Sequence, residues 1–421
     1  MPFFELNLDG LPGPTHHFGG LGYGNRASKV NAHSVSSPLR AGLQAIEKLK
    51  RTVDLGVVQG VLPPHPRPVA LANGQRIYSS SAMWTANAAT VTAARDSKDR
   101  RVHFTPANLV SNLHRAVETP FTTRLLRTLF ADPSFFVVHD PVVLSFPDEG
   151  AANWTRLQGS DGNGLYIAVY GRSVGNPTPL PPTVVPRQSR EALEWITLQH
   201  GLDPSSVLMV QQAPSAVESG VFHNDVIATG FGELMMMHEL AYTVPFGDIA
   251  AAIRNKLPSA RVVEFLNEEL SLSDAVDSYW FNSQWVQTPD GRLVMIAPDS
   301  CRRLPHRDRL ERRILDAGIS EIQWMDLSES LKNGGGPACV RLRVPLDEDA
   351  LSAVHSGIMM NLSRLTEISS WMKRWYRDTL SAAELESPVL HQEACDALCE
   401  LGDILNLAEL FNDPYNLELK I

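Results

Sequence analysis

Six segments of the chain carry apolar residues in continuous or alternating runs and are rich in valine, phenylalanine, isoleucine and tyrosine. Such runs are typical of β-strands, since alternate side chains of a strand face opposite sides of a sheet. We therefore predict strands over Phe135–Phe146, Leu165–Tyr170, Val207–Gln211, Val221–Thr229, Leu293–Ala297 and Cys339–Val344.

Between these segments apolar residues recur at three- and four-residue spacing, which indicates helices with one buried face. The clearest example is Arg190–His200, where Ser189 is placed to cap the first turn and Gly201 follows the last. Further helices are predicted over Pro38–Lys50, Arg307–Ala317, Leu362–Trp375 and Val389–Leu407.

Because predicted strands and helices interleave along the chain, the fold class is α/β or α+β, and the pattern does not determine the topology. No repeat with obvious sequence similarity is present, although a structural repeat with diverged sequence would escape this test. Two proline-rich stretches, 62–68 and 177–186, read as extended connectors rather than as domain linkers.

Composition narrows the class of protein. The 421 residues include 43% hydrophobic and 20% charged residues, and no stretch approaches the roughly 18 apolar residues of a membrane helix. The net charge of −10 opposes binding to phosphate backbones, so we expect neither a nucleic acid nor a membrane as partner. The amino terminus has no secretion-signal pattern, and four cysteines are too few for a disulfide scaffold, so we expect a cytoplasmic protein.

The most conspicuous candidate nucleophile is Cys339, which follows the run Asn333-Gly334-Gly335-Gly336-Pro337-Ala338. Three glycines give a backbone that can approach a ligand closely or move as a lid, and a thiolate is a strong nucleophile. The alternative is that Cys339 is a small buried hydrophobic residue after a tight turn. Cys301 is the rival nucleophile, because Cys395 and Cys399 border the apolar face of a helix.

A cysteine nucleophile needs a base, and His223 is a candidate. Its neighbour Asp225 would share a face of the predicted strand and could hold a cation. The alternative for His223 is a structural histidine bonded in a turn. Glu149 ends a strand-like run, where its carboxylate would orient an imidazole or clamp a guanidinium, or would be an exposed turn residue.

Two loops have the composition of ligand-binding segments. The run Gly10–Ser28 contains six glycines together with Thr15, His16, His17 and Asn25, and it lacks the Gly-Lys-Ser or Gly-Lys-Thr triplet of a phosphate loop. The segment Thr105–Arg115 leads into a predicted helix and, like Arg187, could receive an anion. No spacing of histidine and cysteine fits a zinc site, so we expect no metal.

Taken together, these segments resemble the N-succinylarginine dihydrolase family. The resemblance spans nearly the whole chain and rests on several long sequence words. These words are Asp9-Gly10-Leu11, Gly13-Pro14-Thr15-His16, Gly24-Asn25, Ala27-Ser28, Ser81-Ala82-Met83-Trp84, Thr105–Arg115, Glu149–Asn153, Val221–Val226 and Asn333–Val344. Phe18-Gly19 and Phe231 depart from the usual pattern of the family and concern only the packing of loops.

The resemblance implies an α/β pentein fold, in which five pseudo-symmetric β/α modules form a propeller around a central site, within a single catalytic domain over residues 1–421. It implies a triad of Cys339 as nucleophile, His223 as acid and base, and Glu149 as partner carboxylate. It also implies a homodimer without any cofactor. The substrate-contact positions that it implies are Gly19, Gly20, Leu21, Gly22, Tyr23, Gly24, Asn25, Arg26, Ala27, Ser28, Asn87, His114, Arg115, Arg187, Asp225 and Asn333.

The activity implied by the resemblance is hydrolysis of N-succinylarginine by two waters to N-succinylornithine, two ammonia and carbon dioxide, in arginine catabolism. Two other readings stay open at this point. A simple deiminase or amidinotransferase on the same fold would stop after one ammonia or pass the amidino group to an amine. A binding protein would keep the pocket without turnover, and the intact Cys339, His223 and Glu149 argue against it.

Overall fold

The computed structural model describes residues 3–175 and 183–411, and five three-stranded sheets organise them. In each sheet the middle strand pairs antiparallel with one neighbour and parallel with the other. The sheets are β17 (Arg341–Asp347), β1 (Phe3–Gly10) and β2 (Gln59–Leu62); β5 (Ala89–Thr92), β6 (Val102–Pro106) and β7 (Phe136–Val138); β8 (Trp154–Gln158), β9 (Gly164–Tyr170) and β10 (Val207–Gln211); β11 (Ala228–Phe231), β12 (Leu234–His238) and β13 (Arg261–Phe265); β14 (Gln284–Gln287), β15 (Leu293–Pro298) and β16 (Glu321–Met325).

The predicted α/β class is confirmed, and the five sheets form a structural repeat that the sequence does not reveal. Four of the sheets are built from strands that follow one another along the chain. The fifth joins the first and the last strand of the described chain, since β17 pairs with β1 from Phe3 opposite Asp347 to Asp9 opposite Arg341. A small additional hairpin pairs β3 (Val69–Ala70) with β4 (Arg76–Ile77).

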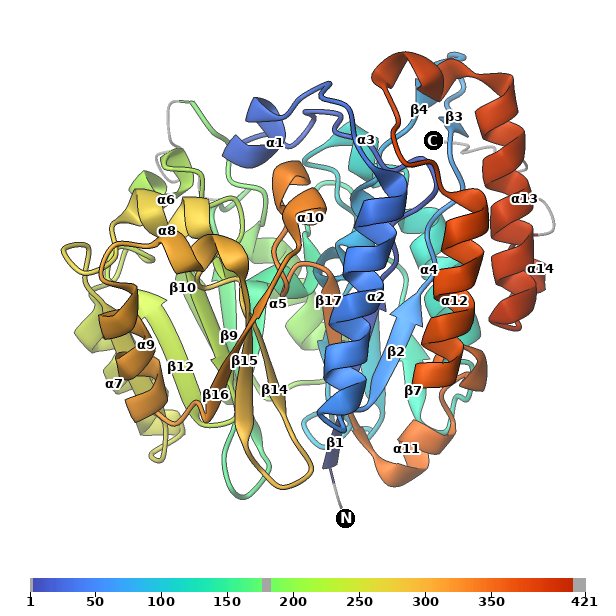
Figure 1. The fold of residues 1–421 in the computed structure, drawn as a ribbon. Helices are drawn as coiled ribbons and strands as arrows, with labels where there is room; N and C mark the ends of the chain where they lie inside the picture. The colour runs from blue at the N-terminus through green and yellow to red at the C-terminus, as the bar shows by residue number, and fades with distance from the viewer. Residues whose placement is uncertain (1–2, 176–182, 412–421) are drawn as a thin grey trace.

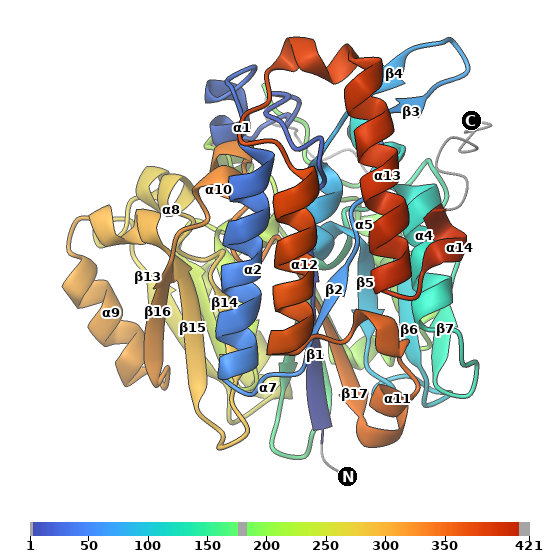
Figure 2. The same ribbon diagram turned by 45° about the vertical axis from the view of Figure 1, so that its right-hand side comes forward.

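Helices cover the sheets, and α2 and α12 lie side by side against the sheet that contains β1 (Figures 1 and 2). The longer helices are α2 (Pro38–Asp54), α4 (Thr119–Leu129), α5 (Arg190–Gln199), α7 (Phe246–Lys256), α9 (Arg307–Asp316), α12 (Leu362–Trp375) and α13 (Pro388–Ile404). The shorter helices are α1 (Arg26–Val30), α3 (Leu113–Ala116), α6 (Pro214–Glu218), α8 (Leu272–Ser278), α10 (Ser328–Asn333), α11 (Glu348–Ser352) and α14 (Ala408–Phe411). Short 3-10 turns are η1 (Ser81–Met83), η2 (Thr85–Asn87), η3 (Gly150–Asn153), η4 (Pro204–Ser206), η5 (Asn224–Val226), η6 (Asp299–Arg303), η7 (Ser356–Ile358) and η8 (Ala382–Glu386).

The helix predictions are confirmed, with shifts of a few residues at the ends of some helices. The predicted cap of α5 is present, because the Ser189 hydroxyl accepts a hydrogen bond from the Ala192 amide at 3.2 Å. In α12 the apolar face is buried at Leu365, Ile368 and Met372 and packs into the same core as the strands β1 and β17. Local periodicity is therefore a reliable guide where a helix buries one face.

Three strand predictions are wrong in whole or in part. The segment 135–146 contains only the three-residue β7, and Pro141 lies in the loop that follows, where a proline cannot donate to a sheet. Over 221–229 the chain forms the turn η5, and a strand begins only at Ala228. The last strand begins at Arg341, two residues after Cys339. His223 and Asp225 therefore do not share the face of a strand.

Two further observations concern segments singled out from composition. The proline-rich stretch 177–186 falls partly outside the described residues, whereas 62–68 runs from the end of β2 toward β3. Over the described ranges, none of the helices is both long and apolar enough to cross a membrane.

A buried ion pair ties α2 to β1. Lys48 is fully buried within α2, and its ammonium group is bonded to the carboxylate of Asp9 on β1. The second oxygen of Asp9 accepts a hydrogen bond from Gln59 of β2 at 3.1 Å. Because a buried charge without its partner carries a large desolvation cost, the pair fixes the position of α2 over the first sheet.

We predict that Lys48→Met lowers the free energy of unfolding by about 3–5 kcal/mol, since it leaves the carboxylate of Asp9 buried without a cation. The double variant Lys48→Met/Asp9→Asn is expected to be more stable than the single variant, because it removes the unpaired charge. Urea unfolding followed by circular dichroism measures both. As a surface control, Arg51→Met removes an exposed pair with Glu47 and should cost less than about 1 kcal/mol. A double variant no more stable than Lys48→Met would contradict this account.

Candidate active site

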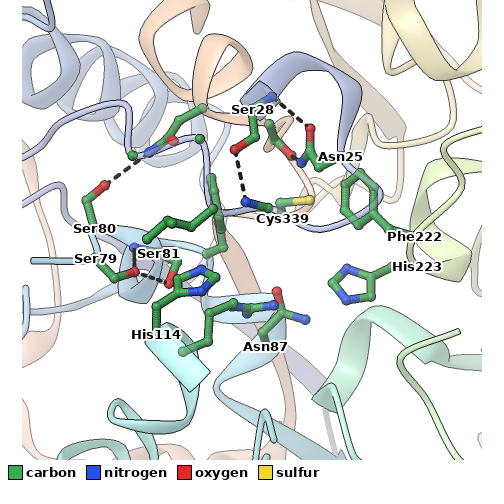
Figure 3. Close-up of a pocket in the computed structure, with 18 of the residues that line it drawn as sticks. Asn25, Ser28, Ser79, Ser80, Ser81, Asn87, His114, Phe222, His223 and Cys339 are labelled. Carbon is green, nitrogen blue, oxygen red and sulfur yellow. Dashed lines mark hydrogen bonds between the residues drawn. The ribbon is translucent and has the colours of Figure 1, made fainter. Parts of the chain in front are cut away.

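A pocket with about 540 Å³ free of protein atoms, here called the front pocket, collects residues from distant parts of the chain. Most of the positions predicted from sequence line it. They are Gly19, Gly20, Leu21, Gly22, Asn25, Ser28, Asn87, His114, Arg115, Arg187, His223, Asn333 and Cys339. Figure 3 shows the Cys339 sulfur pointing toward the side of this pocket where Phe222 and His223 lie.

Two predicted carboxylates lie behind the wall of the front pocket. Glu149 is fully buried next to His223, and Asp225 contacts the sulfur of Cys339. The loop residues Gly24 and Ala27 belong to the segment over the pocket without lining it. Tyr23 contributes its backbone carbonyl, which accepts a hydrogen bond from Arg187.

The structure directs one predicted contact residue away from the pocket. The guanidinium of Arg26 lies 3.4 Å from Asp277 and donates to the hydroxyl of Ser273, and its side chain is half exposed. Arg26 therefore reaches the surface helix α8 rather than the pocket in this structure.

The glycine loop before Cys339 is closely packed. Gly334 has a positive φ of 101°, and a Cβ there would overlap the side-chain amide of Asn25, which donates to the Gly334 carbonyl at 2.8 Å. A Cβ at Gly335 would overlap the ring of Trp84. The glycines therefore bring the loop against the ligand-facing segment at Asn25.

Cys339 itself is held by its backbone on both sides. Its amide donates to the side-chain oxygen of Asn282 at 3.1 Å, and its carbonyl accepts from the amide of Ala86 at 3.0 Å. The side chain is buried, 3% exposed, and lines the front pocket. The rival thiol, Cys301, is bonded to the carbonyl of Ser278 in a separate hydrophobic core, so it faces no pocket with acid and base groups.

Glu149 is the centre of the polar cluster beneath the pocket. One of its oxygens, Oε2, lies 2.8 Å from Arg115 Nη1, 2.8 Å from His223 Nε2 and 3.9 Å from Arg187 Nη1. Its backbone is bonded at the carbonyl by Asn87. Burial alone would raise the pKa of Glu149, but the two arginines and the histidine outweigh it and bring the pKa to about 2. Glu149 is therefore a carboxylate at neutral pH.

His223 is oriented by Glu149. Because Nε2 faces the carboxylate, it carries the proton in the tautomer that this contact favours, and Nδ1 has no hydrogen-bond partner in the protein. Burial lowers the pKa of His223 to about 4 despite the neighbouring carboxylate. The ring is therefore neutral at pH 7 and has a free acceptor nitrogen, as a general base requires.

Asp225 and the thiol of Cys339 are a second pair of ionisable groups in contact, besides Glu149 and His223. The Sγ of Cys339 lies 3.5 Å from Oδ2 of Asp225, so the thiol donates to the carboxyl group. Burial raises the pKa of Asp225 to about 7, and burial together with Asp225 raises the pKa of Cys339 well above its ordinary value. A cation bound between Asp225 and Glu149 would lower the pKa of both carboxyl groups. The pocket therefore favours a positively charged group beside the thiol of Cys339.

The front pocket also carries cations and small polar groups around the Glu149 cluster. Burial lowers the pKa of Arg187 to about 10, so it stays charged at neutral pH, and it stacks 5.0 Å from the ring of Phe222. Burial and Arg115 lower the pKa of His114 to about 3, which leaves its ring neutral. The two arginines that line the pocket are therefore available to an anionic group.

Several lining residues were not singled out as contacts from the sequence: His17, Ser79, Ser80, Ser81, Trp84, Phe222 and Gly334. Ser80 accepts from the Asn333 amide at 3.0 Å and donates to the His17 carbonyl, so it positions the loop start. Ser81 and Trp84 lie in the segment Ser81-Ala82-Met83-Trp84, which carries part of the family resemblance. Asn282, which accepts a hydrogen bond from the Cys339 amide, belongs to no sequence pattern that could have pointed to it. Within residues 3–175 and 183–411, no group of three histidine, cysteine or acidic side chains could hold a metal ion.

Sequence comparisons give one consistent family. A family model for succinylarginine dihydrolase matches residues 2–73 and 70–413. The N-succinylarginine dihydrolase of Photorhabdus laumondii is 42% identical over 98% of this chain and 99% of its own length. That of Paraburkholderia xenovorans is 41% identical over 97% of this chain and 98% of its own.

Solved structures agree at the level of the fold. The N-terminal domain of ArgZ, an arginine dihydrolase from the ornithine-ammonia cycle in cyanobacteria, superposes with a TM-score of 0.53 and 18% identity, covering 81% of this chain and 98% of that one. DDAH from Pseudomonas aeruginosa, complexed with citrulline, has a TM-score of 0.50 and 14% identity over 81% of this chain and 99% of its own. Both are pentein-fold proteins of mixed α/β content.

The contact between Asp225 and Cys339 leads to a prediction about thiol reactivity. We expect Asp225→Asn to speed alkylation of Cys339 by iodoacetamide at pH 7.5, by up to about tenfold for each pKa unit by which the thiol pKa falls. Mass spectrometry of the peptide that contains Cys339 measures the rate. Cys399 on the exposed side of α13 serves as an internal control and should react equally in both proteins. Equal rates at Cys339 would show that Asp225 does not suppress its ionisation.

Proposed function

The chain belongs to the succinylarginine dihydrolase family, and we propose that it hydrolyses N-succinylarginine with two waters to N-succinylornithine, two ammonia and carbon dioxide. One observation carries the proposal. The thiol of Cys339 faces a pocket whose walls are backed by two carboxyl groups, the fully buried Glu149 and the partly buried Asp225, next to a neutral imidazole. This arrangement suits attack on the carbon of a bound guanidinium.

In the proposed complex the guanidinium lies beside Cys339, and the carboxylates of the succinyl-amino acid end lie at Arg187 and Arg115. Arginines form bidentate bonds with carboxylates, which makes them suitable partners for that end. Gly19–Gly22, Asn25, Ser28 and Asn333 line the rest of the same pocket. Leu21 and Tyr23 are exposed at the rim, where the segment 19–28 can close over the substrate.

In the first round the sulfur of Cys339 bonds to the guanidino carbon, one terminal C–N bond breaks, and ammonia leaves. His223 is neutral beforehand, so the proton that it delivers to ammonia is the one released by the thiol. A water then loses a proton to His223 and attacks the thiouronium carbon. The C–S bond breaks, the thiol is restored, and a succinylated citrulline remains.

In the second round Cys339 attacks the carbon of the ureido group, and the second ammonia leaves. Water breaks the new C–S bond and produces a carbamate, which loses carbon dioxide to leave N-succinylornithine. The same acid and base serve both rounds. Glu149 holds the imidazole in the tautomer with its free nitrogen toward the substrate.

We further propose that residues 1–421 act as a single catalytic domain and that the five sheets are arranged as a propeller around the site. We also propose that the enzyme is a cytoplasmic homodimer and works without a cofactor. The shared antiparallel-parallel pattern of the sheets supports the propeller. Gel filtration with light scattering tests the dimer.

Cys339→Ala is expected to abolish turnover of N-succinylarginine, because no other thiol faces the front pocket among its described lining residues. Quantified ammonia and products identified by mass spectrometry provide the measurement. For the unaltered protein we expect two ammonia for each N-succinylornithine formed. A ratio of one with N-succinylcitrulline as product would identify a deiminase, and a Cys339→Ala variant that kept most of its turnover would remove Cys339 as nucleophile.

Arg187→Ala is expected to raise KM for N-succinylarginine by about 10-fold to 100-fold, because it removes charge-assisted hydrogen bonds to a carboxylate of the substrate. Any residual hydrolysis of free arginine should change little, since that substrate lacks the succinyl group. Steady-state kinetics with both substrates makes the comparison. Arg190→Ala is the matched control, because Arg190 pairs with Glu194 on the surface of α5. Equal effects of Arg187→Ala on both substrates would reject the assignment of Arg187 to the succinyl end.

A further inference from the structure

A second, larger cavity with about 1940 Å³ free of protein atoms lies behind the catalytic thiol, and we call it the rear cavity. It shares no lining residue with the front pocket among the described residues. Asp225 and Ala338 line the rear cavity, whereas Cys339 lines the front pocket. The 3.5 Å contact between Cys339 and Asp225 therefore joins the two spaces.

Asp225 has few groups around it that can stabilise its charge. Oδ2 accepts from the thiol of Cys339, and Oδ1 is buried without a hydrogen-bond partner in the protein. Asn282 donates to the backbone carbonyl of Asp225 at 3.3 Å, and the buried phenol of Tyr279 lies in the same cluster with its pKa raised by burial and by the thiol. The cation that acts on Asp225 is Arg341, which lines the rear cavity with it.

Arg341 is itself only weakly compensated. It lies 3.5 Å from Glu5, while Arg343 takes the other oxygen of Glu5 with two bonds of 2.9 and 2.7 Å. The Nε of Arg341 has no partner in the protein, and the residue is 8% exposed. Burial, with Arg343 nearby, lowers the pKa of Arg341 to about 9, so it stays charged at pH 7. Its charge acts on Glu5 and Asp9 and, through the rear cavity that both residues line, on Asp225 as well.

The two rounds of the proposed reaction need opposite hydrogen-bonding properties from the side chain of Asp225. A guanidinium is a cation with hydrogen-bond donors only, so it needs a carboxylate. A ureido group is neutral and presents a carbonyl oxygen, which needs a donor. A carboxylic acid supplies that donor, and the pKa of Asp225, at about 7, makes both forms accessible at neutral pH.

We propose that Asp225 works in both protonation forms. As a carboxylate it holds the guanidinium in the first round, and as a carboxylic acid it donates a hydrogen bond to the ureido oxygen in the second. Arg341 is the positioning residue that sets the balance between the two forms. The proposal rests on the proposed function. Between the rounds Asp225 takes one proton from solvent, and after the second it returns that proton. Arg341 lines the rear cavity and not the front pocket, so in this proposal it does not contact the substrate.

The first test compares N-succinylarginine with N-succinylcitrulline, supplied separately, between pH 5.5 and 9. We expect kcat/KM to rise with pH for the cationic substrate and to fall with pH for the neutral one, with a shared midpoint near 7, since kcat/KM reports the free enzyme. His223 titrates below this range, and Cys339 and Tyr279 above it. The same pH dependence for both substrates would overturn the proposal.

The second test uses variants. Asp225→Asn, a permanent neutral donor, should lower kcat/KM for N-succinylarginine at least 100-fold and for N-succinylcitrulline less than 10-fold. Arg341→Met should move both midpoints to higher pH, whereas Arg341→Lys, which keeps the charge, should restore them. Equal losses in Asp225→Asn, or unmoved midpoints in Arg341→Met, would refute the proposal. If Arg341→Met does not fold, Asp225→Asn still decides. Failure of the unaltered protein to release ammonia from N-succinylcitrulline would instead contradict the proposed function.

Discussion

The whole arrangement depends on one buried carboxylate. Glu149 has no exposure to solvent, and an isolated charge at such a position would carry a cost of several kcal/mol. The cost is offset because Arg115, Arg187 and His223 converge on a single oxygen of the carboxylate. Each of these partners also lines the front pocket. The interaction that stabilises Glu149 therefore sets the orientation of the groups that face the substrate.

This convergence is a product of topology. Arg115 belongs to α3 after β6, Glu149 precedes η3, and His223 precedes η5, so the cluster joins segments of three different sheets. Closure of the first sheet by β1 and β17 brings Cys339, just before the last strand, to the same place as the loop at Asn25. The proposed nucleophile is thus positioned by pairing between the first and the last strand of the described chain.

The sequence predicts the parts of this structure that are governed locally. Helix α5 follows from a cap and a periodic face, and β9 follows from an uninterrupted apolar run. The turn η5 was mistaken for strand because Val221 and Val226 are buried by the surrounding fold rather than by a sheet. Asn282 and Arg341 could not be found from the sequence, since a single polar residue has no pattern and its importance arises from tertiary contacts alone. For the same reason the five-sheet repeat is visible only in the structure.

The two acidic residues of the site show how environment separates identical chemistry. Glu149 is fully buried and Asp225 is partly buried, and burial raises the pKa of each. Glu149 faces two arginines and a histidine, which bring its pKa to about 2, whereas Asp225 faces a thiol and the more distant Arg341, which leave its pKa at about 7. Where neighbouring carboxyl groups differ this widely, the one with the low pKa acts as a fixed charge and the other can exchange protons during turnover. In the proposed mechanism the fixed charge belongs to the residue that orients the base, and the variable one belongs to the residue that meets a substrate whose own charge changes between rounds.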